Sequence, residues 1–249
     1  MVRKITYSII FCTVFFSAHE AFAQSKNKIA VSAEFVQVKD RFNHGMLFNG
    51  PQVGFQYQRL WNFSAVELSY NPKIALGIPF SREMAAVNIN FTPIDASCLR
   101  YVYQSDSHSL KTGLNFATNY SYQLYPYLQS ARLFWFGEIG FSPAIEYQYK
   151  WEERAIRINL QNSVFGFISR TNDYDPYFFS LEFIDFFVSP HKNLQFGSFD
   201  KYNHAKVHIE YTSNTLNSNS LAFGMEYIGA YFNVHFQSLI YQLQWRKFF

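Results

Sequence analysis

The chain has few cysteines, a small net charge and few long apolar runs. Cys12 and Cys98 are the two cysteines among its 249 residues. Cys12 belongs to the N-terminal segment described below, so the rest of the chain has one cysteine and cannot form an internal disulfide. Charged residues make up 16% of the chain, and the formal net charge is +3 at pH 7. A surplus this small predicts no strong attraction to nucleic acid.

The longest apolar run stands at the N-terminus. After two basic residues it extends over Ile5–Ala18, and the small residues Ala21 and Ala23 follow. This order is typical of a cleavable secretory signal, and the run is shorter than the roughly 20 residues that a membrane helix needs. We therefore expect residues 1–23 to be a signal peptide and residues 24–249 to form the mature protein, in which no apolar stretch is long enough for a membrane helix.

Aromatic residues, by contrast, are abundant. They make up 20% of the chain, with 29 Phe and 18 Tyr, yet the mean hydropathy is only −0.13. Apolar residues must therefore be finely interspersed with polar ones. Such a composition suits transmembrane strands, because one face of each strand meets lipid while the other meets a polar lumen.

Strict alternation of apolar and polar residues is the dominant local pattern. Val53, Phe55 and Tyr57, for example, alternate with Gln and Gly. The same period of two recurs in further runs, whose apolar members are Val66, Leu68 and Tyr70; Ala85, Val87, Ile89 and Phe91; Leu99, Tyr101 and Tyr103; Leu110, Leu114 and Phe116; Ile145, Tyr147, Tyr149 and Trp151; Ile156, Ile158 and Leu160; Val207, Ile209 and Tyr211; and Leu221, Phe223, Met225 and Tyr227. No comparable stretch favours the helical period, so the sequence predicts an all-β protein.

The number of runs sets the expected architecture. Turn-rich segments separate about twelve runs if Ala131–Trp151 is one strand, or thirteen if Pro143 divides it. Closed bacterial barrels normally have an even number of strands. We therefore expect a transmembrane antiparallel up-and-down β-barrel of about 12 strands, with ten as the alternative. A soluble β-sandwich is the competing fold, but it would need shorter strands and a polar outer face.

The C-terminal segment carries the most specific signal. Apolar residues share one face of a final strand: Leu239, Tyr241, Leu243, Trp245 and Phe249. Gln242, Gln244 and Arg246 share the other face, and Lys247 interrupts the apolar one. The segment resembles the terminal strand of Gram-negative outer-membrane β-barrel proteins, in which an alternating strand that ends in Phe is the signal for the barrel-assembly machinery. This resemblance implies the outer membrane as location, and outer-membrane lipids and the assembly machinery as partners.

If the apolar members of each run face lipid, their charged neighbours face the lumen. The acids predicted to face the lumen are Glu34, Glu67, Glu138, Glu146, Glu210 and Glu226. The predicted lumen-facing bases are Arg100, Lys111, Lys150, Arg157, Lys206 and Arg246. Because a lone charge in a narrow lumen is costly, we interpret them as ion pairs that brace the barrel. A charged selectivity constriction is the alternative.

Histidine and serine patterns give little support for catalysis. His208 and Glu210 share a face of a strand, as an acid–base pair or metal site would require. His204 and His208, however, are four residues apart, a spacing that brings side chains together on a helix and not on a strand. In Ser107-His108-Ser109, adjacent side chains point to opposite faces, so we expect a turn and not a catalytic relay. The sequence therefore predicts no catalytic residue, no metal and no cofactor.

These observations favour a non-enzymatic barrel, either a narrow channel for small polar solutes or a structural component of the envelope. The alternative is a lipid-modifying barrel enzyme, which would need a serine or carboxylate beside a histidine on neighbouring strands. A surface-binding module is a third class, but the connections near 40–51 and 189–203 are too short for an independent domain. Trp61, Trp151 and Trp245 lie near strand ends and suit the aromatic girdles at the bilayer interfaces.

Overall fold

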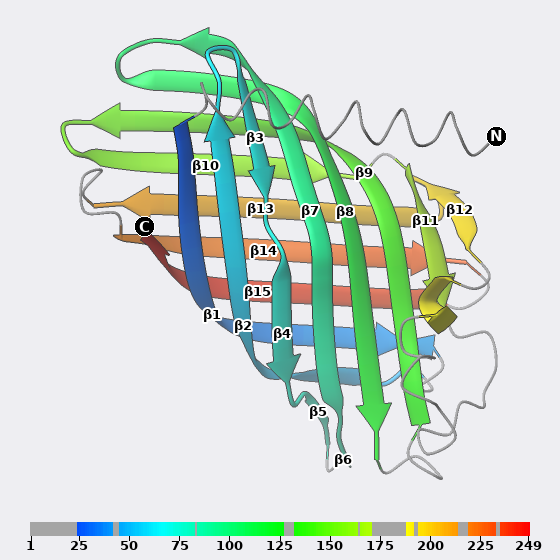
Figure 1. Cartoon of the computed structure of the whole chain (residues 1–249). Helices are drawn as coiled ribbons and strands as arrows, with labels where there is room; N and C mark the ends of the chain where they lie inside the picture. The colour runs from blue at the N-terminus through cyan, green and yellow to red at the C-terminus, as the bar shows by residue number, and fades with distance from the viewer. Residues whose placement is uncertain are drawn as a thin grey trace.

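The structure, a computed structural model, describes almost only β-strands (Figure 1). The described residues are 24–41, 45–82, 84–126, 132–163, 165–170, 188–191, 194–213, 219–232 and 235–249. The predicted signal peptide, residues 1–23, lies outside the described residues. Within the described part, no helix is long and apolar enough to span a membrane.

The strands follow one another closely along the chain. Their bounds are β1 (Gln24–Asp40), β2 (Leu47–Asn62), β3 (Val66–Tyr70), β4 (Lys73–Gly77), β5 (Phe80–Ser81), β6 (Met84–Ala85), β7 (Val87–Gln104), β8 (His108–Tyr125), β9 (Arg132–Trp151), β10 (Arg154–Asn162), β11 (Phe165–Arg170), β12 (Gln195–Ser198), β13 (Tyr202–Thr212), β14 (Asn219–Tyr231) and β15 (His235–Phe248). A short 3-10 helix, η3 (Ser189–His191), precedes β12.

The segments build one closed antiparallel barrel of ten strands. Three of the ten strands consist of two segments each, namely β3 with β4, β10 with β11, and β12 with β13. The barrel closes because β1 pairs with β2 on one side and with β15 on the other, from Lys28 opposite Phe248 to Asp40 opposite Phe236. A closed ladder pairs the backbone polar groups along every strand, which allows such a sheet to cross hydrocarbon.

The expectation of twelve strands was wrong, and the alternative of ten is confirmed. The strands are longer than a bilayer crossing requires, since β8 has 18 residues and β9 has 20. Pro143 does not divide β9, because its side chain lies on the exposed face and the pairing with β8 runs through it. On the other side of β9 the partner changes at this point, since pairing with β10 ends at Ala144 and pairing with β11 begins at Phe141. Because each strand is long, a chain of this length forms fewer strands than predicted.

The two ends of the barrel differ in their connections. At the end where β1 starts and β15 finishes, the β2–β3, β7–β8 and β9–β10 connections have only two or three residues. The connections at the opposite end are mostly longer, that between β11 and β12 above all, although β14–β15 there has three residues and β13–β14 at the first end has six. We call these the turn end and the loop end. Short turns face the periplasm in outer-membrane barrels and long loops face outward.

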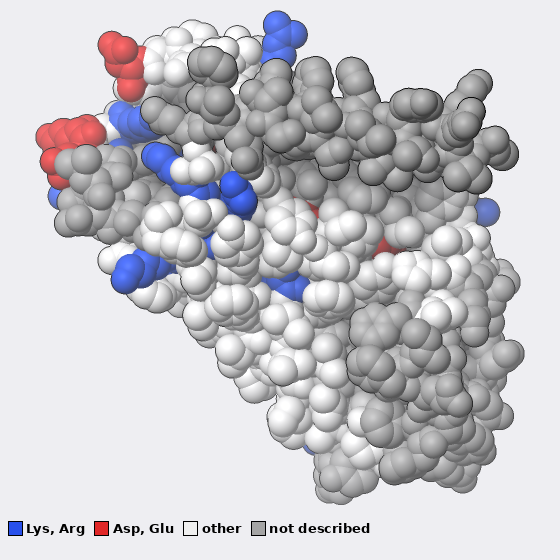
Figure 2. Space-filling model, viewed as in Figure 1, with Lys and Arg blue, Asp and Glu red and all other residues white. Residues whose placement is uncertain are grey.

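Side chains alternate between an exposed apolar face and the lumen. On β1, Val31 and Phe35 are exposed, whereas Ser32 and Val36 are buried. Figure 2 shows few charged residues in the middle of the viewed face, while Lys and Arg gather toward the end where Figure 1 marks the C-terminus. An apolar outer band of this kind fits contact with lipid.

The terminal strand has the predicted orientation. Tyr241, Leu243, Trp245 and Phe249 are exposed on the outer face. Their neighbours Gln242, Gln244 and Arg246 line a cavity in the lumen. The side-chain alternation of β15 therefore matches the sequence pattern that resembles an assembly signal. Its reading by the assembly machinery stays a prediction.

A row of glycines makes room for one tyrosine inside the barrel. Gly140 on β9 lies opposite Gly166 on β11, which in turn lies opposite Gly197 on β12. The ring of Tyr202, which is fully buried, packs against this row. A Cβ atom would lie 3.2 Å from Tyr202 Cε1 at Gly166 and 2.9 Å from Tyr202 Cβ at Gly197. A larger residue at either position would displace the ring or separate the strands.

We expect Gly166→Val to lower the free energy of unfolding of the barrel by about 1–3 kcal/mol, and with it the melting temperature. The added methyl groups would overpack against Tyr202 and the carbonyl of Ile139. Ala33→Val is the matched control, because Ala33 lies on the exposed face of β1. The measurement is the temperature at which the heat-modifiable gel band is lost. Equal transition temperatures for both variants would contradict the packing described here.

Candidate functional site

The lumen near the turn end contains a layer of buried charges, which we call the turn-end charge layer. Its members come from seven different strands of the barrel and all point inward. They are Lys28, Glu67, Lys111, Glu146, Arg157, Glu210 and Arg246. Successive side chains of a strand point to opposite faces, so the charged residues point into the lumen where the apolar residues next to them point outward.

Glu210 is the acceptor at one side of this layer. Lys28 Nζ lies 3.1 Å from its Oε1, and Arg246 Nη1 lies 3.0 Å from its Oε2. Arg246 also contacts His208 Nε2 through Nη2 at 2.7 Å. Glu210 is 2% exposed and Lys28 is 1% exposed, so both charges are shielded from bulk water. Removing one partner would leave the other charge buried and unpaired.

Lys111 holds the other side of the layer together. Its ammonium lies 2.7 Å from Glu67 Oε2 and 2.8 Å from Glu146 Oε1, and it stands 5.0 Å from the ring centre of Tyr101. Arg157 Nε approaches Glu146 Oε1 at 3.5 Å. One ammonium thus bridges carboxylates from β3 and β9, two strands that are not neighbours in the barrel.

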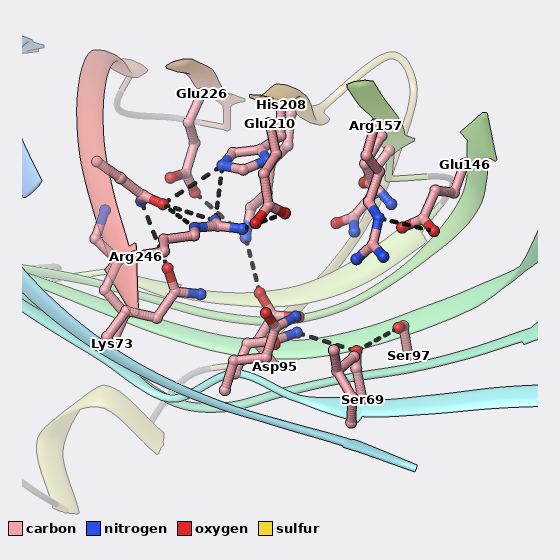
Figure 3. Close-up of a pocket in the computed structure, with 18 of the residues that line it drawn as sticks. Ser69, Lys73, Asp95, Ser97, Glu146, Arg157, His208, Glu210, Glu226 and Arg246 are labelled. Atoms are coloured by element: carbon pink, nitrogen blue, oxygen red, sulfur yellow. Dashed lines mark hydrogen bonds and ion pairs between the residues drawn. The ribbon is translucent and has the colours of Figure 1, made fainter. Parts of the chain in front are cut away.

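A polar cavity of about 120 Å³ lies next to the turn-end charge layer (Figure 3). Its wall includes Asn159 and Gln161 of β10, Gln56 of β2, Ser97 of β7 and Gln242 of β15. In Figure 3 the guanidinium of Arg157 extends into this space, and the interaction drawn for it is the one with Glu146. A space of this size and polarity can hold several waters or a small solute.

A second group of buried polar residues, the central polar cluster, lies farther from the turn end. It consists of Asp95, Glu138, His204, Lys206 and Glu226. His204 Nδ1 lies 2.7 Å from Glu138 Oε1, and His204 Nε2 lies 2.8 Å from Glu226 Oε1. An imidazolium could donate to both carboxylates. Lys206 Nζ lies 3.5 Å from Glu226 and 3.6 Å from Asp95.

Glu34 has a polar network of its own. Lys73 Nζ lies 2.7 Å from its Oε1, and Gln52 Nε2 donates to its Oε2 at 2.9 Å. Asn88 Nδ2 donates to Gln52 Oε1 at 2.8 Å, and Lys73 Nζ donates to Gln242 Oε1 at 3.1 Å. This network connects β1, β2, β4, β7 and β15 across the interior.

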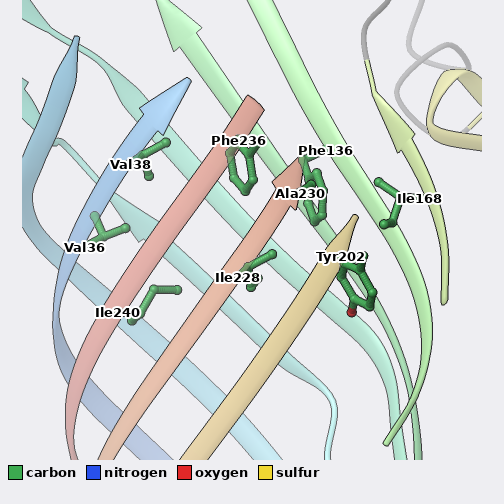
Figure 4. Close-up of a cluster of buried hydrophobic side chains, with 9 residues drawn as sticks. All are labelled: Val36, Val38, Phe136, Ile168, Tyr202, Ile228, Ala230, Phe236 and Ile240. Atoms are coloured by element: carbon green, nitrogen blue, oxygen red, sulfur yellow. The ribbon is translucent and has the colours of Figure 1, made fainter. Parts of the chain in front are cut away.

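An apolar layer lies in the lumen on the loop-end side of these polar groups, along the six consecutive barrel strands from β9 through β15 to β1 (Figure 4). Strands β7 and β8 turn polar residues toward it, and a cavity of about 30 Å³ lies between. Its buried members are Val36, Val38, Phe136, Ile168, Tyr202, Ile228, Ala230, Phe236 and Ile240. Phe136 of β9 stacks on Phe236 of β15 with ring centres 4.5 Å apart, although three barrel strands separate β9 from β15. Side chains from opposite walls therefore meet in the middle.

A further apolar group and an ion pair lie near the loop end. Phe48 of β2 contacts Tyr125 of β8 with ring centres 4.9 Å apart, in a cluster with Phe134 and Ala86. Arg170 Nη2 lies 2.7 Å from Asp40 Oδ2, and its guanidinium stands 5.2 Å from the ring centre of Phe236. These contacts also connect strands that are not neighbours.

Most of the charges predicted to face the lumen lie there. Buried positions are taken by Glu34, Glu67, Lys111, Glu138, Glu146, Glu210 and Arg246. Arg157, Lys206, His208 and Glu226 are less buried and line the cavity. Lys150 shares the inward parity of Glu146 but is exposed, because it lies at the mouth of the turn end.

The predicted placement of Arg100 was wrong. Arg100 is exposed, whereas Leu99 is buried and lines the cavity. The cause is a register shift in β7, where Phe91 pairs with Tyr120 but Ile94 pairs with Thr118. One extra residue in β7 reverses which side chains point inward beyond that point.

Sequence reasoning missed several interior charges. Lys28 has the same parity on β1 as Glu34, so alternation alone could have placed it. Asp95 was hidden by the register shift in β7. Lys73 and Arg170 lie in short segments whose alternation does not identify a face. Asp40 ends β1 and has the same parity as Glu34, so alternation extended to the end of the strand could have placed it.

The structure does not assemble a serine–histidine relay from the described residues. His204 lies between two carboxylates, and Ser163 Oγ contacts the backbone carbonyl of His204 at 3.1 Å instead of its ring. His108 Nδ1 contacts the hydroxyl of Tyr147 at 2.8 Å in an exposed position. Neither histidine is paired with a serine hydroxyl as acyl transfer would require.

Comparison with known proteins supports the barrel class. The sequence matches no family model and no curated protein. Among solved structures, the outer-membrane protease OmpT of Escherichia coli is similar with a TM-score of 0.52 and 8% identity, over 90% of this chain and 96% of that one. The translocator domain of autotransporter NalP of Neisseria meningitidis has a TM-score of 0.47 and 5% identity, over 98% and 97%. An outer-membrane channel of Pseudomonas putida F1 has a TM-score of 0.43 and 8% identity, over 92% and 98%.

At this level of identity the likeness concerns the fold. Together with the closed sheet and the apolar outer face, it makes the chain a β-barrel of the bacterial outer-membrane class. The short-turn end is then the periplasmic end, and the loop end faces the exterior.

We expect Lys111→Met to destabilise the folded barrel by about 3 kcal/mol, because Glu67 and Glu146 would keep their charges without the ammonium between them. Lys39→Met is the control, since Lys39 is exposed on the outer face of β1. Urea unfolding of both variants in lipid vesicles, followed by tryptophan fluorescence, measures the difference. A Lys111→Met variant as stable as the control would show that the bridge contributes nothing.

Proposed function

We propose that the protein is a closed outer-membrane barrel that acts as a structural component of the envelope, and not as an open diffusion channel. The observation that carries this proposal is the apolar layer, in which Phe136 and Phe236 stack across the lumen. Hydrated solutes cross apolar constrictions poorly, because they would have to shed water without gaining polar contacts.

The polar side of the lumen supports the same conclusion. Next to the cavity, Lys28 and Arg246 contact Glu210, and Lys111 contacts Glu67, each across at least one intervening strand, while Lys111 also contacts Glu146 on the neighbouring strand. These side chains are held in fixed contacts inside the lumen. The braced interior favours rigidity over conduction.

The lipid-modifying alternative receives less support. Its minimal requirement is a nucleophile beside a histidine that lipid can reach. The histidine with carboxylate partners, His204, is 3% exposed and lies inside the barrel. The likeness to a protease barrel concerns the fold and carries no activity over to this chain.

Planar-bilayer recording tests the proposal. We expect the purified protein to give no steady current, because the apolar layer and the charge layer narrow the lumen. The double variant Phe136→Ala/Phe236→Ala should show brief openings, because removing the stacked rings clears the middle of the lumen. Phe223→Ala, on the exposed face of β14, is the control and should stay silent.

Large and stable currents from the unmodified protein would overturn the closed-barrel proposal and favour a diffusion channel. Silence of all variants combined with release of fatty acid from added lipid would instead favour the enzyme.

A further inference from the structure

The charges inside the barrel are unevenly distributed along its axis. The inward-facing cations at the turn end are Lys26, Lys28, Lys111, Lys150, Arg157 and Arg246. The inward-facing carboxylates at that end are Glu67, Glu146 and Glu210. Cations therefore outnumber carboxylates at the periplasmic mouth, although the whole chain is nearly neutral.

The carboxylates at this end are already shared. Glu210 contacts both Lys28 and Arg246, and Glu146 contacts Lys111 and Arg157. Glu67 is occupied by Lys111 as well. These carboxylates therefore leave the surplus positive charge at the mouth uncompensated.

Lys150 and Lys26 carry much of this surplus. The charged groups acting on Lys150 are Arg157, Lys111 and Lys26, which are all cations. Within the described residues, no ion pair joins Lys150 or Lys26 to a carboxylate. Glu152 and Glu153 are exposed in the β9–β10 turn outside the mouth, and neither is in contact with Lys150.

Arg157 stands where this positive region meets the cavity, whose own lining has both signs of charge, with five carboxylates, Glu67, Asp95, Glu146, Glu210 and Glu226, against four cations. Its described ion pair uses Nε, at 3.5 Å from Glu146 Oε1, and leaves the two terminal nitrogens directed into the space seen in Figure 3. Asn159 and Gln161 follow on the same face of β10 and offer amide groups to the same cavity. A guanidinium with free terminal N–H groups matches the paired oxygens of a phosphate or carboxylate.

We propose that the periplasmic mouth of the barrel binds a small oxyanion, a phosphate or carboxylate group on a soluble molecule, between Lys26, Lys150 and Arg157. Uncompensated cations in a mouth with low-dielectric walls focus the field and raise the local concentration of anions. The exposed ammonium groups of Lys26 and Lys150 attract the anion from the periplasm, and the Arg157 fork fixes it. This binding requires no passage through the apolar layer, so it is compatible with a closed barrel.

The test uses inorganic phosphate as the probe and the purified full-length barrel in detergent at low ionic strength. Titration calorimetry should detect binding to the unmodified protein. Lys150→Gln and Arg157→Gln should each weaken it by about tenfold, because each removes one charge-assisted contact. Lys39→Gln, a change of the same kind on the outer face of β1, should leave the affinity unchanged.

Thermal stability gives a second readout that a merely structural role would not produce. Without phosphate and at low salt, Lys150→Gln should melt at a higher temperature than the unmodified barrel, because it relieves repulsion among cations. Added phosphate should raise the melting temperature of the unmodified barrel more than that of Lys150→Gln. If Arg157→Gln fails to assemble, Lys26→Gln takes its place, because Lys26 is exposed and outside the ion pairs.

Absence of phosphate binding to the unmodified barrel, or equal affinities for Lys150→Gln and Lys39→Gln, would overturn the proposal. Conductance is recorded separately. A barrel that conducts freely and still binds phosphate through Lys150 would overturn the closed-barrel proposal and leave this one standing.

Discussion

The cost of placing charge inside a lipid-embedded barrel is the constraint on which the structure depends. Each lumen-facing carboxylate in the described part of the chain contacts a cation, as Glu210 does with Lys28 and Glu34 does with Lys73. Most of these pairs join strands that are not neighbours, so they hold distant parts of the wall at fixed distances, whereas Lys111–Glu146 and His204–Glu226 join neighbouring strands. The apolar layer around Phe136 and Phe236 can pack tightly because the walls are held in this way.

Alternation in the sequence predicted the class of fold and the direction of most side chains. This was possible because the period of two in a strand follows from backbone geometry and needs no tertiary information. Lumen-facing Glu67 and Lys111 and the exposed residues Leu243 and Trp245 of the last strand follow from it directly. The partners of each charge did not follow, since pairing across the lumen depends on how strands far apart in the sequence are arranged.

The failures also have local causes. Arg100 was placed inward because the alternation gives no sign of the extra residue in β7 between Phe91 and Ile94. Pro93, which stands there, is a local signal of an irregular strand that was not used. The predicted number of strands was too high, because the alternation of side chains does not show how far a strand extends beyond the bilayer. β9 continues through Pro143, which stays paired with β8, although on its other side the ladder passes from β10 to β11 at this point.

The sequence distances between interior partners have a consequence for how the barrel forms. Lys28 and Glu210 are 182 residues apart, Lys73 and Gln242 are 169 apart, and Arg170 and Asp40 are 130 apart. None of these contacts can exist in a sheet that has not yet closed, because loop closure must precede the contacts that reward it. An open intermediate would therefore present unpaired charges on the face that becomes the lumen. Insertion should accordingly be a cooperative event, in which pairing of the last strand with β1 brings these distant partners into contact in one step.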